Sequence, residues 1–119
     1  MSLDGLRVLL VEDEAIIAMT AEDMLEELGC TVAATATNIE EAFACVEQRE
    51  FDVALLDINL NGQQSLPVAA ALTGKGTPFV FTTGYGAAGS GADYVDVPLV
   101  TKPYQLADLE TAIRQALGR

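Results

Sequence analysis

Histidine and tryptophan are absent from this 119-residue chain, cysteine occurs only twice, and only six residues are lysine or arginine. Without histidine the chain lacks the usual general base near neutral pH, a phosphohistidine carrier and a His-ligated metal. Any chemistry must therefore use carboxylates, hydroxyls or lysine. Cys30 and Cys45 are too few and too far apart for a disulfide framework or a zinc site, and they suit a reducing cytoplasm.

Basic charge is scarce, and long apolar runs are missing. Eighteen Asp and Glu residues give a formal net charge of -12, which repels a phosphate backbone, so we expect no nucleic-acid binding. No uninterrupted apolar run nears the roughly 20 residues that span a bilayer, and the start MSLDGLRVLL has no signal-like pattern. We expect a cytoplasmic protein without membrane contact. A chain of 119 residues, 50% of them hydrophobic, suits one domain.

Strand and helix patterns alternate along the chain. Short apolar or β-branched runs predict five strands, at residues 6–11, 31–36, 53–56, 79–83 and 99–101. Apolar residues at helical spacing predict helices at residues 14–28, 39–49 and 106–117, and Pro67 suits the first turn of a short helix. Such alternation predicts an α/β fold, an open five-stranded parallel sheet with helices on both faces. The strand at 31–36 is the weakest and is expected at an edge.

The segment GYGAAGSGAD, residues 84–93, contains four glycines and predicts a short or frayed fourth helix. Its Gly84, Gly86 and Gly89 also spell GxGxxG, a pattern found in dinucleotide-binding turns. In those folds the glycines follow the first strand and open a helix, whereas here they follow the fourth strand and no helix-forming run succeeds them. We therefore do not assign a dinucleotide site.

The chemically interesting residues close the predicted strands. Glu12 and Asp13 follow the first strand, Asp57 the third, Thr83 the fourth and Lys102 the fifth. Taken singly, each has a simpler explanation, since Asp13 could cap a helix and Lys102 could be a solvated charge. Because the carboxyl ends of parallel strands meet at one edge, all five are expected to converge. That coincidence favours a functional site.

A cluster of three carboxylates predicts a cation. Two carboxylates about 4 Å apart repel by roughly 4 kcal/mol at an effective dielectric near 20, and a third increases the repulsion. A divalent cation would hold Glu12, Asp13 and Asp57 deprotonated, and oxygen ligands suit Mg2+ that keeps several waters. At such a site Asp57 can accept a phosphoryl group, with Thr83 and Lys102 contacting its oxygens.

Four motifs carry a family resemblance: VEDE at 11–14, LLDINL at 55–60, FTTGY at 81–85 and TKP at 101–103. In order and approximate spacing they resemble the receiver domain of bacterial two-component response regulators, over the whole chain. PFVFTTGYG further resembles a subset of stand-alone receivers with a Phe-Ala-Thr-Gly-Tyr signature. The resemblance implies a flavodoxin-like topology and one receiver domain over residues 1–119 with no output domain.

The resemblance also implies the site roles. Asp57 becomes the phosphoacceptor, Asp13 a direct Mg2+ ligand, Glu12 the holder of a metal-bound water, and the carbonyl of Asn59 a further ligand. Thr83 would move toward the phosphoryl group. Lys102 would pair with that group, and its bond to Pro103 is expected to be cis.

The implied function is that of a response regulator which takes a phosphoryl group from a sensor histidine kinase or phosphotransfer protein. It would act as an enzyme only on itself, in its own Mg2+-dependent phosphorylation and dephosphorylation, and it would signal through Thr83 and Lys102. The resemblance indicates neither the target of the protein nor whether it forms a homodimer.

Three positions depart from the family: Leu99 replaces an aromatic residue, Asn61 a proline and Thr82 an alanine. With Leu99 present, we expect ordering of residues 84–93 to replace the aromatic switch.

Two other functions remain open. A phosphatase of the haloacid-dehalogenase type also uses a strand-end Asp, but it needs a second Asp two residues later, where this chain has Asn59. A receiver that binds partners without being phosphorylated is the second alternative. The intact acceptor, acid pair and lysine favour a receiver that is phosphorylated.

Overall fold

The computed structural model describes residues 3–84, 94 and 96–118. Its central sheet has five parallel strands in the order β2-β1-β3-β6-β7. The strand bounds are Arg7–Val11 for β1, Thr31–Ala36 for β2, Val53–Asp57 for β3, Phe79–Thr83 for β6 and Leu99–Thr101 for β7. This confirms the predicted five-stranded parallel sheet, with the strand at 31–36 at an edge.

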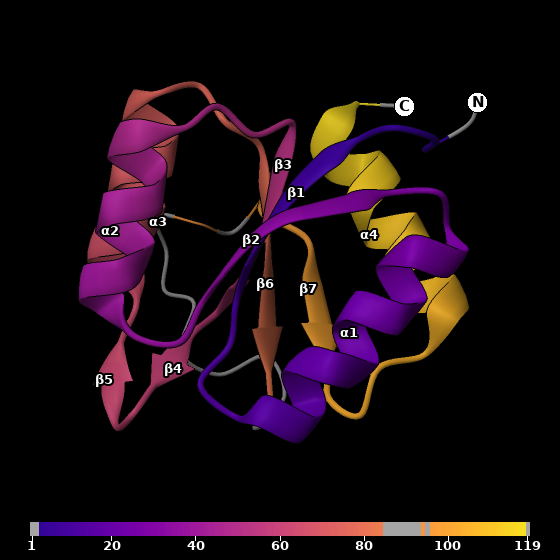
Figure 1. Cartoon of the computed structure of the whole chain (residues 1–119), viewed down its shortest axis with the longest axis horizontal. Coiled ribbons are helices and arrows are strands. Elements are labelled where there is room, and N and C mark those ends of the chain that lie inside the picture. The colour runs from indigo at the N-terminus through magenta and orange to yellow at the C-terminus, as the bar shows by residue number, and fades with distance from the viewer. Residues whose placement is uncertain (1–2, 85–93, 95, 119) are drawn as a thin grey trace.

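Four helices of the described residues cover the two faces of the sheet. They are α1 (Ala15–Glu27), α2 (Ile39–Gln48), α3 (Leu66–Gly74) and α4 (Leu106–Leu117). Helices α2 and α3 lie on one face and α1 and α4 on the other (Figure 1). The strand order and the two helix layers are those of the flavodoxin-like fold, as predicted. The predicted short helix at 84–93, and its ordering on phosphorylation, lie outside the described residues except for Gly84.

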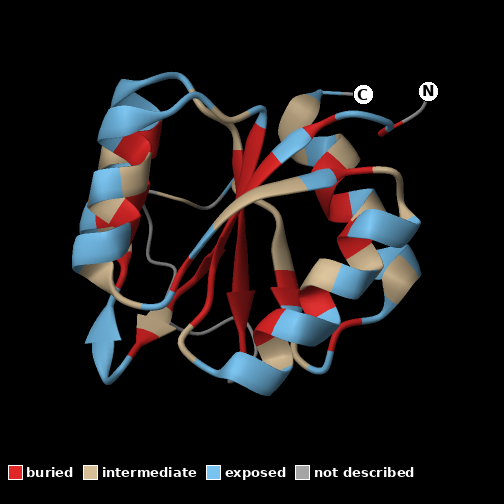
Figure 2. Ribbon diagram, in the orientation of Figure 1, coloured by how far each residue is buried: buried red, intermediate tan, exposed pale blue. Residues whose placement is uncertain are grey.

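The central strands β1, β3 and β6 are largely buried because each contributes side chains to two hydrophobic cores. Leu10 and Leu55 pack in the core beneath α1 and α4, whereas Leu9 and Leu56 pack in the core beneath α2 and α3. Alternation of side chains along a strand produces this division. All five residues of β3 and all five of β6 are buried, and Figure 2 shows these central strands in red. Polar residues are therefore accommodated at the strand ends.

The entry to α2 follows a capping-box pattern. The Asn38 side chain accepts a hydrogen bond from the Glu41 N–H at 2.8 Å. The Glu41 carboxylate reaches back to the Thr37 N–H at 2.8 Å, one residue before the cap. These bonds satisfy backbone donors that the first turn of a helix leaves unpaired, and they fix the chain direction after β2.

A small hairpin follows β3 and was not predicted as such. Strands β4 (Asn59–Leu60) and β5 (Gln63–Gln64) pair antiparallel around Asn61 and Gly62. The φ angles of these two residues are 53° and 81°, as a two-residue type I′ turn requires. Asn-Gly is the preferred sequence for that turn, so the signal was present in the loop INLNGQQS. Proline, the family residue expected at position 61, could not adopt this φ.

Candidate functional site

The predicted carboxylates meet at the carboxyl ends of β1 and β3. Glu12 and Asp13 follow β1, and Asp57 is the last residue of β3. Each offers a carboxylate oxygen, and these three oxygens all lie within 4.8 Å of one another. Glu12 is fully buried and Asp57 is 3% exposed. The sequence prediction of a convergent acid cluster is therefore confirmed.

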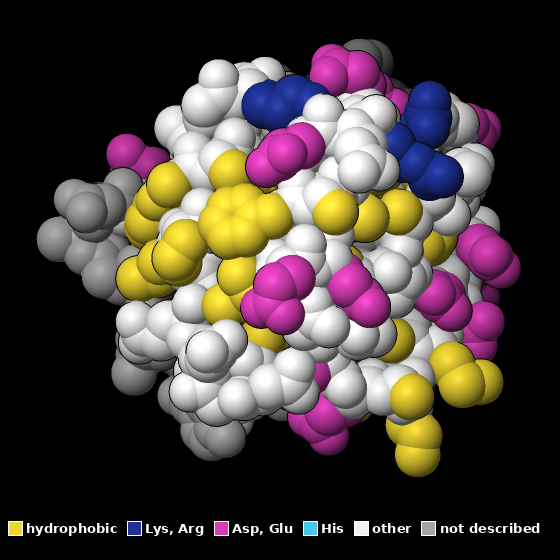
Figure 3. All heavy atoms as spheres, turned by 60° about the vertical axis from the view of Figure 1, so that its left-hand side comes forward, with side chains coloured by type: hydrophobic (Ala, Val, Ile, Leu, Met, Phe, Trp, Pro, Cys, Tyr) yellow, Lys and Arg dark blue, Asp and Glu magenta, His cyan; other side chains and the backbone are white. Residues whose placement is uncertain are grey.

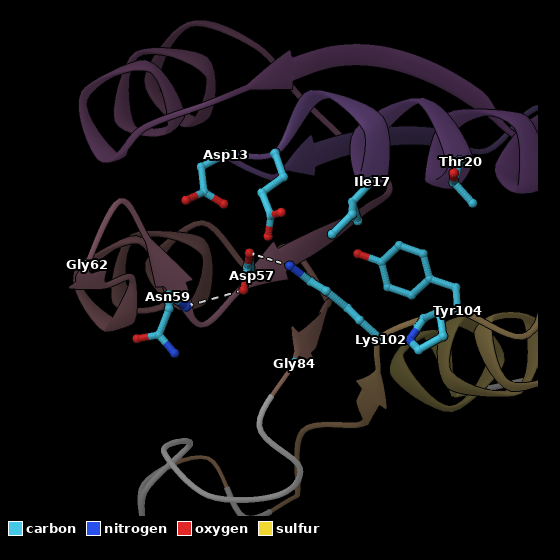
Figure 4. A pocket seen from close by; sticks show the side chains of 11 residues that line it. Asp13, Ile17, Thr20, Asp57, Asn59, Gly62, Gly84, Lys102 and Tyr104 are labelled. Carbon is cyan, nitrogen blue, oxygen red and sulfur yellow. Dashed lines mark hydrogen bonds and ion pairs between the residues drawn. The ribbon is translucent and has the colours of Figure 1, made fainter.

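Lys102 lies between two of these acids. Its Nζ is 2.7 Å from Glu12 Oε1 and 2.7 Å from Asp57 Oδ2, and its side chain is 11% exposed. Figure 4 shows the lysine reaching across the site to Asp57. The alternative of a solvated charge is therefore wrong. The Lys102–Pro103 bond is cis, as predicted.

Burial and ion pairing shift the ionisation of this cluster. Burial raises the pKa of Glu12 to about 7, although hydrogen bonds from Lys102 and the Glu14 N–H lower it. Burial also raises the pKa of Asp57, against the lowering effect of Lys102. Burial alone would lower the pKa of Lys102, but its bonds to Asp57 and Glu12 outweigh that effect and raise it. The ammonium thus stays charged while the acids favour a proton or a second cation.

Asp13 is not the cap of α1. The N-cap position is Glu14, with no side-chain capping bond. Instead Asp13 Oδ2 accepts a hydrogen bond from the Asn61 N–H at 2.8 Å, so the β4–β5 turn holds the carboxylate. The Asn61 side chain also donates to the Thr37 carbonyl at 3.2 Å. The sequence departure at position 61 therefore has a direct contact with the acid cluster.

Asn59 and Thr83 lie beside the same strand ends. The Asn59 N–H donates to Asp57 Oδ1 at 3.2 Å, and Asn59 lines the cavity above that carboxylate (Figure 4). Thr83 is buried, and its carbonyl accepts from the Lys102 N–H at 2.8 Å, which joins the ends of β6 and β7. The predicted roles of the Asn59 carbonyl and of Thr83 movement stay predictions.

Three polar residues near the site were missed from sequence. The Ser65 hydroxyl donates to the Asp57 carbonyl at 2.5 Å. The hydroxyl of Tyr104, a buried residue, lies 3.4 Å from Glu12 Oε1. Burial raises the pKa of Tyr104 to about 12, although a hydrogen bond with the Thr82 side chain acts in the opposite direction. A serine in a loop and a tyrosine after Lys-Pro carry no periodic signal, so only the fold reveals these contacts.

The site opens into a cavity of about 720 Å³. Charged groups of Asp13, Asp57 and Lys102 line one part, and Ile17 and Tyr104 line another (Figure 4). Three carboxylates against one ammonium leave an excess of two negative charges, which a divalent cation with oxygen ligands would match. The donor set therefore fits Mg2+.

Acidic side chains are also exposed on the surface of the molecule. On the face drawn in Figure 3, acidic side chains are spread between apolar ones, and basic side chains gather toward one end. This agrees with the net charge of -12. Among the residues that the structure describes, no helix is long and apolar enough to cross a membrane.

Known proteins share this arrangement. The family profile of the response regulator receiver domain matches residues 8–114. The chain belongs to this family. As a receiver domain it is 29% identical to the transcriptional regulatory protein PdtaR of Mycobacterium tuberculosis, over 95% of the chain and 57% of that protein. The receiver domain thus spans little more than half of this curated relative.

Solved structures agree with this assignment. The solution structure of SdrG from Sphingomonas melonis Fr1 is 39% identical, with a TM-score of 0.86, and the match covers 98% of this chain and 99% of that one. The BeF3-activated conformation of SdrG, from Pseudomonas melonis Fr1, is 38% identical with a TM-score of 0.81, covering 97% and 99%. The receiver fold is therefore shared over nearly the whole length of both chains.

Proposed function

We propose that this receiver domain accepts a phosphoryl group on Asp57 and so acts as a response regulator in phosphorelay signalling. The observation that carries the proposal is the environment of the Asp57 carboxylate at the wall of the cavity. Lys102 Nζ contacts its Oδ2 at 2.7 Å and the Asn59 N–H contacts its Oδ1 at 3.2 Å. Both donors fix the orientation of the acceptor, and the ammonium offsets negative charge on incoming phosphoryl oxygens.

The donor would be a phosphohistidine of a sensor kinase or phosphotransfer protein. An Asp57 oxygen forms a bond to phosphorus as the bond from phosphorus to the imidazole nitrogen breaks, and that nitrogen keeps the electron pair. The carboxylates of Asp13 and Asp57 and the carbonyl of Asn59 would hold Mg2+, with Glu12 on a metal-bound water, and the ion would supply positive charge for the phosphoryl oxygens. The chain itself contains no histidine, so the donor must be another protein or a small phosphodonor.

The signal would start when the Lys102 ammonium changes its partner. A phosphoryl group on Asp57 brings about two negative charges to the cavity. Lys102 would then turn from Glu12 toward the new oxygens, and the Thr83 hydroxyl would be drawn toward the same oxygens. The bond from the Lys102 N–H to the Thr83 carbonyl keeps the two strand ends side by side. This movement changes the surface at the ends of β6 and β7, where a downstream protein or a second copy of the chain would bind. We place this activity in the cytoplasm.

The phosphatase alternative is weaker. An acid/base Asp would have to stand at position 59, where Asn59 instead uses its N–H to bond Asp57. We therefore propose that the chain catalyses only its own phosphorylation and dephosphorylation.

Incubation with acetyl phosphate and Mg2+, followed by intact mass spectrometry, tests the proposal. We expect one phosphoryl adduct that is labile to base, and none in Asp57→Asn. Absence of an adduct on the unmodified chain would support the unphosphorylated binding module. Labelling of Asp57→Asn at the same site, or rapid turnover of many phosphoesters, would refute the proposal.

A further inference from the structure

Glu12 is a fully buried carboxylate, so its position depends on the donors around it. Its Oε2 accepts a hydrogen bond from the Glu14 N–H at 3.1 Å. Its Oε1 faces two donors, the Lys102 ammonium at 2.7 Å and the Tyr104 hydroxyl at 3.4 Å. In the resting chain the ammonium is the closer and stronger partner.

The Tyr104 hydroxyl is itself held by its surroundings. Tyr104 is 6% exposed, with its ring packed in the core beneath α1 and α4. Figure 4 shows the ring alongside Lys102 with the hydroxyl turned toward the acid cluster. Thr82, also buried, hydrogen bonds to Tyr104 through its side chain. Thr82 stands where the receiver signature has alanine, so this contact gives the substitution a structural consequence.

The two donors on Glu12 differ in what phosphorylation does to them. Lys102 also contacts Asp57 Oδ2 and is the group that new phosphoryl oxygens attract. In the part of the chain that the structure describes, Tyr104 makes no hydrogen bond to Asp57, and its buried ring fixes its hydroxyl near Glu12. When the ammonium turns away, the hydroxyl is the donor that stays beside Oε1.

We propose that Tyr104 is a positioning residue whose hydroxyl, oriented by Thr82, holds the Glu12 carboxylate when Lys102 turns to a phosphoryl group on Asp57. This inference rests on the proposed function. It predicts that loss of the hydroxyl affects the phosphoryl-bound state more than the resting state, because in the resting state Lys102 still neutralises Glu12.

Tyr104→Phe removes the hydroxyl and keeps the ring. The probes are Mg2+ alone, and then beryllofluoride, a stable phosphoryl analogue, in saturating Mg2+. Amide shifts of Asp57 and Asn59 in NMR spectra report both titrations. We expect the Mg2+ midpoint to change by less than about twofold and the beryllofluoride midpoint to rise by about tenfold, the size of a lost hydrogen bond to a charged group.

Matched variants separate positioning from structure. Tyr94→Phe removes a hydroxyl from a ring that packs against Phe79 and Phe81, and both of its midpoints should equal those of the unmodified chain. Thr82→Val should raise the beryllofluoride midpoint in the same direction as Tyr104→Phe, but should add nothing in the Tyr104→Phe background. Thr82→Ser, which keeps a hydroxyl, should restore the unmodified ratio of the two midpoints.

The ratio of the two midpoints decides the inference, since a general loss of stability would shift both. Equal weakening of both midpoints by Tyr104→Phe, or no weakening of either, would overturn it. A further effect of Thr82→Val in the Tyr104→Phe background would overturn the role of Thr82. If the unmodified chain takes up no beryllofluoride, the proposed function is refuted and this inference with it. If the unmodified chain and Tyr104→Phe take up beryllofluoride with the same midpoint, only the inference is refuted.

Discussion

Replacing Lys102 with methionine tests whether the ammonium neutralises the acid cluster. The side chain is 11% exposed and lies 2.7 Å from both Glu12 and Asp57, so methionine fills similar space but leaves the two carboxylates unpaired. Their oxygens are no more than 4.8 Å apart, which corresponds to a repulsion of at least about 3.5 kcal/mol at an effective dielectric near 20. Breaking a buried ion pair costs about 3–5 kcal/mol, so the two figures agree.

Proton uptake by Glu12 limits that cost and makes it depend on pH. The pKa of Glu12 is already raised to about 7 with Lys102 present, from an ordinary value of 4.5, and removal of the ammonium raises it further. The unfolded chain then releases this proton at lower pH than the folded chain, so the free energy of unfolding falls as pH rises between the two values. We expect Lys102→Met to cost about 3 kcal/mol at pH 8 and about 1.5 kcal/mol at pH 6.

Urea denaturation at both pH values, with and without Mg2+, measures this effect. Added Mg2+ should recover part of the loss at pH 8, because a cation replaces the missing positive charge. Lys75→Met is the matched control: Lys75 pairs with Glu50, which is 88% exposed, and bonds the carbonyls of Val46 and Arg49. Its cost should be the same at both pH values and with Mg2+. A Lys102→Met cost that is equally insensitive would refute the electrostatic account.

Three further predictions follow from individual contacts. The Mg2+ affinity of the unmodified chain, measured by calorimetry, should fall by up to about tenfold for each pH unit below 7. The reason is that the raised pKa of Glu12 lets protons compete with Mg2+ for the acid cluster. An affinity that does not change with pH would contradict this. Asn61→Pro should weaken Mg2+ binding, because it removes the N–H that holds Asp13. Asn61→Gly is the control, since it keeps that N–H and the positive φ. Equal Mg2+ affinities of the two variants in the same assay would show that the turn does not support the site. Ser65→Ala should lower the free energy of unfolding by about 1–3 kcal/mol, because the carbonyl of buried Asp57 loses the Ser65 hydroxyl that donates to it. If urea denaturation detects no change, another donor has replaced that hydroxyl.

The sequence carried most of the fold because burial and periodicity coincide in this chain. Runs such as 53–56 are apolar at every position and form strands buried on both faces. The site residues could be predicted for a related reason: they stand where such runs end, and parallel strands end at one edge. Asp13 was open to two interpretations, and only its contact with Asn61 distinguishes them.

The hydroxyl network could not be predicted in the same way. Tyr104 and Glu12 are 92 positions apart and touch through side chains only. Thr82 lies in a buried strand, where a β-branched residue needs no functional reason. Such contacts depend on the directions of side chains in the packed structure, which no local pattern encodes.

Uncharged donors hold the carboxylates of the acid cluster in place. Each carboxylate of the cluster has a donor besides Lys102: the Asn61 N–H on Asp13, the Tyr104 hydroxyl on Glu12 and the Asn59 N–H on Asp57. None of these donors carries a charge, so the excess negative charge remains for a cation. In the proposed function these donors would stay with the acids, so that Lys102 would turn to a phosphoryl group without leaving a buried carboxylate unbonded. A lysine that can exchange carboxylate partners for phosphoryl oxygens, within an acid cluster that other donors hold, would make the proposed switch reversible.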